Sequence, residues 1–278
     1  MAVFVIARLS FLEASRRWIL WAALILGVAF LAIYAIGFNE IRKDTERSIS
    51  NAIASSETYN FLMMAGLYVV NFLTVMMTVL SSVDAISGEI ASGVIHTLLS
   101  KPVRRWQVIL GKWLGFEMML SLYLFLMAGG VIAVTYWLSK YHSPNLWNGL
   151  GLMWLNTALL LSITFLGGTV LSTIANGVLA FGLYGIAFIG GWIEQFGSFF
   201  QNQNAINIGI LCSLLIPSEA IWRRASYEMQ SALASAMGGF ANPFSLGATP
   251  SQAMIVYAVL YTLTTLGLAV RKFSQRDL

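Results

Sequence analysis

The sequence has few of the residues on which soluble enzymes depend. Charged side chains make up only 10% of its 278 residues, against about 25% in an ordinary soluble domain. The single cysteine, Cys212, excludes a disulfide within the chain, and two widely separated histidines, His96 and His142, form no metal-ligand cluster by spacing. With 58% hydrophobic residues and a mean hydropathy of +0.76, the chain is predicted to be an integral membrane protein without catalytic, cofactor-binding or metal-binding residues of its own.

A nucleotide-binding loop is also missing. The nearest approach to a phosphate-binding motif is the stretch from Gly88 to Gly93, and Val94 follows it where the motif requires a lysine to reach the phosphates. The net charge of +4 does not indicate a nucleic-acid partner, because the basic residues flank apolar runs instead of forming a patch with aromatic residues between them. Any ATP-driven function of this chain therefore needs another polypeptide to hydrolyse the nucleotide.

Apolar runs of membrane-spanning length dominate what is present. A helix needs roughly 20 apolar residues to cross the hydrocarbon layer, and six runs meet this requirement. They are approximately Trp18–Phe38, Phe61–Ser82, Trp113–Trp137, Leu150–Ile174, Val178–Ile193 and Ala253–Val270. The sequence thus predicts an all-α, polytopic membrane protein with six transmembrane helices in a single domain, residues 1–278.

The basic residues predict the orientation of these helices. Lys and Arg in short loops remain preferentially on the cytoplasmic side. They precede the first run, separate the second from the third, and follow the last: Arg8, Arg16 and Arg17; Lys101, Arg104, Arg105 and Lys112; Arg271, Lys272 and Arg276. An even number of spans places all three groups on one side, so we expect a multi-pass protein of the cell membrane with both termini in the cytoplasm.

Two segments outside the six runs have patterns of their own. Residues 1–17 mix apolar with charged side chains, which is typical of a helix lying in the membrane surface. Within residues 194–251, the apolar run Ile206–Ile216 is too short to span, and Pro217 with Ser218 predicts a break followed by a new helix. We expect a re-entrant or interfacial hairpin on the extracytoplasmic side before the sixth span.

The basic residues of that hairpin conflict with its predicted location on the extracytoplasmic side. Arg223 and Arg224 would lie on the outer side, against the preference of basic residues for the cytoplasm. Glu219 and Glu228 stand at helical spacing from them and offset their charge.

The polar loop at residues 83–112 is the candidate functional segment. If Asp84–Leu99 is helical, Glu89, Ser92 and His96 share one face, opposite an apolar stripe. Two glycines within it each cost a helix about 1 kcal/mol relative to alanine, which leaves open one continuous helix or two short pieces. One face is expected to rest on the protein and the other to meet a partner.

Pro102 divides this loop. The residue before a proline is biased away from the helical region, and proline itself suits a first helical turn, so a second helix is expected to begin there. Along it, Arg104, Arg105 and Lys112 can reach lipid headgroups before the third span enters the bilayer.

The loop resembles the corresponding loop of the ABC-2 type permeases, the membrane subunits of ATP-driven exporters. The family pattern is a Glu, a Gly four residues on, a Leu-rich turn, a Pro, an Arg three residues later and a Gly-Lys pair. The matching positions are Glu89, Gly93, Leu98 with Leu99, Pro102, Arg105, and Gly111 with Lys112. The chain departs from the family at Val94, where a threonine is common, which weakens a hydroxyl contact there.

The resemblance implies an assembly of two permeases and two ATPases in a lipid bilayer. ATP and Mg²⁺ would be held by the ATPase subunits, whose closure would move the permease through residues 84–105. The residues that it places at the ATPase interface are Glu89, Ser92, Gly93, His96, Pro102, Arg104 and Arg105. The partner permease is a second copy of this chain or a related one.

Three polar residues within the predicted spans are candidates for a role inside the membrane, where polar side chains are costly. Glu117 lies about one turn beyond Lys112, and an ion pair between them is favoured over a transport role. Asn71 and Asn156 are expected to hydrogen-bond between helices, at about 1 kcal/mol or less each.

Two other classes of function fit the same composition. A secondary transporter would couple flux to an ion gradient without ATP. Against this reading, the predicted spans show no series of inward-facing carboxylates in addition to Glu117. A membrane assembly or scaffold protein would bind a partner and show neither flux nor stimulated ATP hydrolysis.

Overall fold

The computed structural model describes residues 2–48, 52–93, 103–231 and 249–276, and the regular elements within these ranges are all helices. They are α1 (Ala2–Ser15), α2 (Trp18–Ser48), α3 (Ala52–Ser82), α4 (Ser87–Ala91), α6 (Arg105–Ser139), α7 (Leu146–Val170), α8 (Thr173–Phe199), α9 (Gln203–Leu215), α10 (Ser218–Met229) and α12 (Gln252–Gln275). The predicted all-α fold is confirmed.

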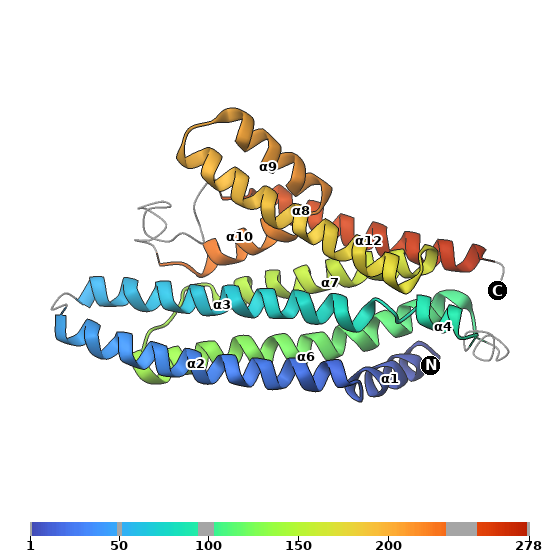
Figure 1. The fold of residues 1–278 in the computed structure, drawn as a ribbon, viewed down its shortest axis with the longest axis horizontal. Helices are drawn as coiled ribbons and strands as arrows, with labels where there is room; N and C mark the ends of the chain where they lie inside the picture. The colour runs from blue at the N-terminus through green and yellow to red at the C-terminus, as the bar shows by residue number, and fades with distance from the viewer. Residues whose placement is uncertain (1, 49–51, 94–102, 232–248, 277–278) are drawn as a thin grey trace.

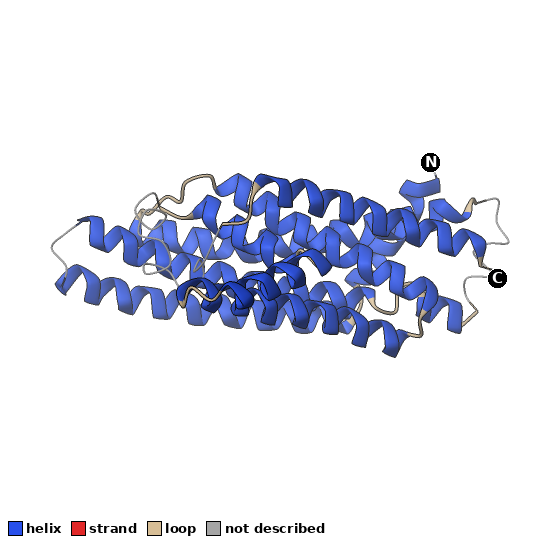
Figure 2. Ribbon diagram, turned by 90° about the horizontal axis from the view of Figure 1, so that it is seen from above, coloured by secondary structure: helices blue, strands red, loops and turns tan. Residues whose placement is uncertain are grey.

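Six of these helices, α2, α3, α6, α7, α8 and α12, are long and apolar enough to cross a membrane. The number rises to seven if α9 and α10 together form one span. The long helices run beside one another along the longest axis of the molecule, and both termini and α4 lie at the same end (Figures 1 and 2). We call this end the terminal end and the other the opposite end.

The first span continues further than its apolar run. The run was expected to end at Phe38, whereas α2 continues to Ser48 through a charged stretch. Arg42 pairs with Glu46 at 2.7 Å, and Lys43 pairs with Glu40 at 2.8 Å. Side chains three or four residues apart are neighbours on a helix, so these pairs favour the helix beyond its apolar part.

The boundary between the fourth and fifth spans was predicted wrongly. Hydropathy continued the fourth run to Ile174, but α7 ends at Val170 and α8 begins at Thr173. Ser172 stands between them with an extended backbone, at φ −67° and ψ 160°. The turn is made by small and apolar residues, which leave no minimum in hydropathy to mark it.

The break at Pro217 was predicted correctly. Helices α9 and α10 meet there at an angle of 103°, and α9 runs back along α8 (Figure 1). This close return depends on small residues: a Cβ atom added at Gly190 of α8 would lie 2.2 Å from the Cβ of Cys212 on α9. The depth of this hairpin in the membrane stays a prediction.

The N-terminal helix is also confirmed as a helix, and it packs on α6 through two glycines. A Cβ atom at Gly111 would lie 2.7 Å from the Cβ of Ile6, and one at Gly115 would lie 2.5 Å from the backbone oxygen of Ala7. Gly111 and Gly115 share a face because they are four residues apart. This small-residue face therefore serves packing within the chain.

Replacing Gly115 by alanine is expected to lower the free energy of unfolding by about 1–3 kcal/mol, the usual cost of forcing atoms into a packed contact. The backbone of α1 must shift, because its own atoms are the obstacle. Gly129 of the same helix is the matched control, since no atom lies within 4 Å of a Cβ added there. Unfolding in detergent micelles measures both variants, and equal stability of the two would contradict the close α1–α6 contact.

Candidate functional site

In the described part of the segment that joins α3 to α6, residues 83–93 and 103–104, the regular element is the short helix α4. The sequence left open one continuous helix over Asp84–Leu99 or two short pieces, and residues 94–99 lie outside the described residues. The helix α4 covers Ser87–Ala91, and Gly93 after it has a left-handed backbone with φ 73°. This favours the interrupted alternative. The second helix was expected from Pro102, whereas α6 begins at Arg105 with Arg104 as its N-cap. Pro102 and His96 lie outside the described residues.

Glu89 of α4 is bound inside the protein by a lysine. The Nζ atom of Lys112, on α6, donates to the Glu89 carboxylate and to the backbone oxygen of Ala85 at 3.2 Å. The Lys112 side chain is 3% exposed and that of Glu89 18%. The second Glu89 oxygen is buried and has no hydrogen-bond partner in the described part of the chain. Glu89 thus connects α4 firmly to α6.

This pairing corrects the predicted contact between Lys112 and Glu117. Residues five apart are turned by about 140° around a helix of 3.6 residues per turn, so their side chains point to different faces. Glu117 is buried, and neither of its carboxyl oxygens has a hydrogen-bond partner among the residues described.

A second ion pair connects the same segment to the turn between α1 and α2. The Arg17 guanidinium donates to Asp84 at 2.5 Å, to the Ser81 backbone oxygen at 3.3 Å and to Glu13 at 2.7 Å. Burial lowers the pKa of Arg17, but the hydrogen bonds and charges of Glu13 and Asp84 outweigh it, so the pKa lies above its ordinary value. Arg17 therefore remains charged. Sequence reasoning missed this partner of Asp84.

Two neutral contacts connect the segment to the start of α8. Asn176, fully buried on α8, donates from its amide to the backbone oxygens of Val83 at 3.0 Å and Thr164 at 2.9 Å. The hydroxyls of Ser87 and Thr173 are hydrogen-bonded at 2.8 Å. Asn176 in addition joins α8 to α7. No signal in the sequence distinguished it from the other asparagines.

Arg105 binds the C-terminal end of the chain. It was expected to reach lipid headgroups, but its guanidinium donates to the backbone oxygens of Ser274 at 3.2 Å and Arg276 at 2.5 Å. Arg276 in turn donates to the Thr169 backbone oxygen at 2.6 Å. Arg104 is exposed, and its backbone nitrogen donates to Gln107 at 3.0 Å. The start of α6, the end of α7 and the end of α12 are thereby held together.

The remaining predicted interface residues lie on the outside of this arrangement. Ser92 is exposed immediately after α4, and Gly93 beside it is half-buried. Together with Arg104, Ser92 offers polar groups at the terminal end of the bundle (Figure 1). The described part of the segment is thus fixed to α6, α8 and the turn before α2, while Ser92 and Arg104 are exposed.

The two asparagines within the spans do contact each other. The Asn156 amide on α7 donates to the Asn71 side-chain oxygen on α3 at 3.2 Å, and both residues are buried. The expected hydrogen bond between helices is therefore present, with Asn71 and Asn156 as its two partners.

A buried ion pair in the hairpin was not foreseen. Arg223 of α10 donates to Glu194 of α8 at 2.7 Å, with side chains 4% and 10% exposed. Helical spacing had directed attention to Glu219 instead. Arg224 pairs with Glu228 as its spacing predicted. The hairpin is thus joined to α8 by a charge pair as well as by its close packing.

The chain was compared with models of known protein families. The model described as ABC-2 family transporter protein matches residues 4–278, almost the whole chain. A search of curated proteins gave no match to this chain.

Proposed function

This chain belongs to the ABC-2 family of transporter proteins, and on that premise we propose that it is the permease subunit of an ATP-driven exporter. A separate ATPase subunit would hold ATP and Mg²⁺ and would act on residues 84–105. A second permease, either another copy or a related chain, would complete the assembly. Membership of the family makes the chain a membrane transporter subunit; the partner, the direction of transport and the site of contact are the proposal.

The observation that carries the proposal is the set of contacts around α4. Asp84 is paired with Arg17 beside α2, and Glu89 is paired with Lys112 on α6. Asn176 binds the backbone at Val83 from α8. A partner that displaces the described part of this segment would therefore act directly on α6 and α8, and on α2 through Arg17 in the turn before it.

The distribution of charge supports contact with the partner from the cytoplasm. The turn between α1 and α2, which contains Arg17, and the first turns of α6, which contain Lys112, lie toward the terminal end, where both chain termini are found (Figure 1). Basic residues flanking spans are preferentially cytoplasmic, so the terminal end would face the cytoplasm.

The residues of the proposed ATPase interface would have different roles. Arg105 would anchor the segment, since it is bound to the backbone at Ser274 and Arg276. Ser92, Gly93 and Arg104 would contact the partner from the open side. Glu89 would pass the displacement to Lys112, since its carboxylate is already bound there. His96 and Pro102 remain in the proposed interface from outside the described residues.

Purification of the chain from its native membranes tests the proposal. We expect an ATP-hydrolysing subunit to copurify, and Glu89→Gln to lower the permease-dependent rate of ATP hydrolysis by roughly tenfold, the factor that corresponds to 1.4 kcal/mol. The reason is that a neutral amide at position 89 cannot hold the Lys112 ammonium as the carboxylate does.

Glu46→Gln is the matched control, because Glu46 also pairs with a basic residue but is exposed on α2 near the opposite end. It should leave the rate unchanged. Flux driven by an ion gradient without ATP would identify a secondary transporter instead. A copurifying partner with neither flux nor stimulated hydrolysis would identify an assembly protein.

A further inference from the structure

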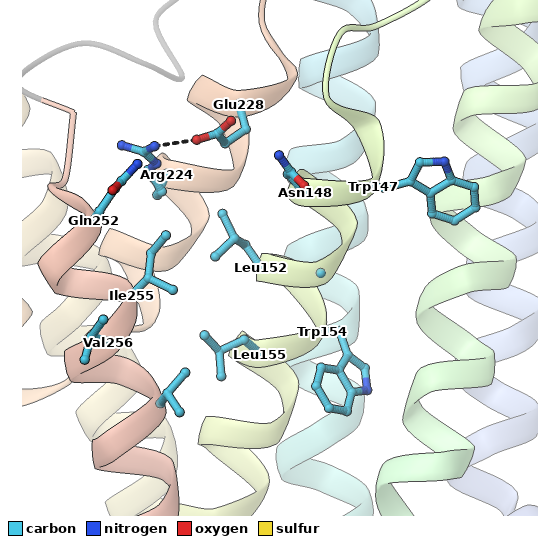
Figure 3. A pocket seen from close by; sticks show the side chains of 12 residues that line it. Trp147, Asn148, Leu152, Trp154, Leu155, Arg224, Glu228, Gln252, Ile255 and Val256 are labelled. Atoms are coloured by element: carbon cyan, nitrogen blue, oxygen red, sulfur yellow. Dashed lines mark hydrogen bonds and ion pairs between the residues drawn. The ribbon is translucent and has the colours of Figure 1, made fainter.

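A groove of about 650 Å³ lies between α7, α10 and α12, in the part of the bundle near the opposite end (Figure 3). Its walls are apolar side chains from the two spanning helices: Leu152, Leu155, Ile255, Val256 and Val259. A volume of this size is typical of sites for small molecules. The groove belongs neither to the α4 segment nor to its contacts.

The polar groups of the groove gather at one end. Arg224 and Glu228 of α10 form an ion pair there, with Asn148 and Gln252 beside them (Figure 3). Arg224 also donates to the backbone oxygen of Pro250 at 3.2 Å. Its Nε atom is buried and has no hydrogen-bond partner within the described ranges.

An exposed tryptophan lies beside the polar end of the groove. Trp147, at the start of α7, lines the groove and is 78% exposed. Tryptophan is enriched where the hydrocarbon meets the headgroups. The polar end of the groove is therefore expected at headgroup depth, with the apolar walls extending from it into the hydrocarbon layer.

We propose that this groove binds a zwitterionic phospholipid of the surrounding bilayer, with its phosphate at Arg224, its ammonium group at Glu228 and an acyl chain between α7 and α12. The ion pair presents one positive and one negative group side by side, which complements a headgroup that carries both charges. Arginine also matches the geometry of a phosphate. The apolar walls complement the chain, and since α7 and α12 are spanning helices, the groove is open to the lipid itself.

A steric variant tests the site without touching its charges. Gly151 lines the groove, and no atom lies within 4 Å of a Cβ added there, so a side chain can begin at this position without a clash and Gly151→Leu is expected to fill part of the groove. Gly182→Leu is the matched control, because Gly182 on α8 has the same open space and does not line the groove.

The full chain is stripped of lipid in detergent, and dioleoylphosphatidylethanolamine is added back. We expect one retained lipid by native mass spectrometry and a higher unfolding temperature. Gly151→Leu should weaken this binding by roughly tenfold or more, and Gly182→Leu should not.

The headgroup is tested separately. Dioleoylphosphatidylglycerol, which has the phosphate without the amine, should bind more weakly because Glu228 repels its net negative charge. The exchange Arg224→Glu with Glu228→Arg keeps the ion pair within α10 but reverses its order, and it should also weaken phosphatidylethanolamine binding. Any of three results would overturn the proposal. They are equal binding of the lipid to the native chain and to Gly151→Leu, equal affinity of the native chain for the two lipids, and a cross-link from Val256→Cys to a second copy of the chain.

Discussion

Replacement of Lys112 by methionine should lower the free energy of unfolding by about 3 kcal/mol, the loss expected when one partner of a buried ion pair is removed. The Lys112 side chain is only 3% exposed, so the Glu89 carboxylate would lose its counter-charge in a site that water scarcely reaches. Unfolding in detergent micelles measures this loss. The same variant should lose permease-dependent ATP hydrolysis, because α4 would no longer be fixed to α6.

The double variant Glu89→Gln with Lys112→Met separates stability from coupling. With both charges gone, most of the lost stability should return, while stimulated ATP hydrolysis should stay low. Lys43→Met is the control, since its pair with Glu40 is exposed and such pairs contribute about 1 kcal/mol or less. If Lys112→Met unfolds no more easily than Lys43→Met, the α4–α6 pair does not hold the segment.

Replacement of Arg223 by methionine should cost about 3–5 kcal/mol of stability, for the same physical reason. It leaves Glu194 of α8 buried without its cation, with the side chain 10% exposed. It also removes the charge contact that joins α10 to α8. The unfolding transition in micelles again provides the measurement.

Arg42→Met is the matched control for this second pair, because Arg42 bridges to a glutamate that is 54% exposed. Combining Arg223→Met with Glu194→Gln should recover much of the loss. If Arg223→Met lowers the free energy of unfolding no more than Arg42→Met does, the hairpin is held to α8 by packing alone.

The spans were predictable because the bilayer leaves few choices. A backbone in hydrocarbon must satisfy its own hydrogen bonds, so an apolar run of sufficient length becomes a helix. Pro217 marked the bend between α9 and α10 for an equally local reason, the lack of a backbone donor. The end of α7 at Val170 was not predicted, because no local chemistry distinguishes Val170 from the residues around it.

The ion pairs that join the candidate site to the rest of the bundle were not predictable from local spacing in the sequence. Asp84 and Arg17 are 67 residues apart, and only the packing of the turn before α2 against the end of α3 brings them together. The expected Lys112–Glu117 pair ignored the angle between their faces. Glu89 was identified by its place in the family pattern, but its partner was not, because Lys112 becomes a neighbour only in the folded bundle.

The hairpin shows the same limit. Helical spacing predicted the Arg224–Glu228 pair correctly, since both residues lie on one helix. For Arg223 the same reasoning indicated Glu219, whereas the close approach of α8 supplied Glu194 instead. Local pairs can thus be read from the sequence, and pairs between helices need the fold.

The most direct test of the central claim is a cross-link from position 92. Ser92→Cys in a Cys212→Ser background carries one thiol, exposed beside α4, to which a photoactivatable maleimide is attached in the complex purified from native membranes. The account predicts a cross-link to the ATP-hydrolysing subunit, and none from Trp137→Cys, which is exposed at the opposite end. A complex that hydrolyses ATP and gives no cross-link from position 92 would contradict it.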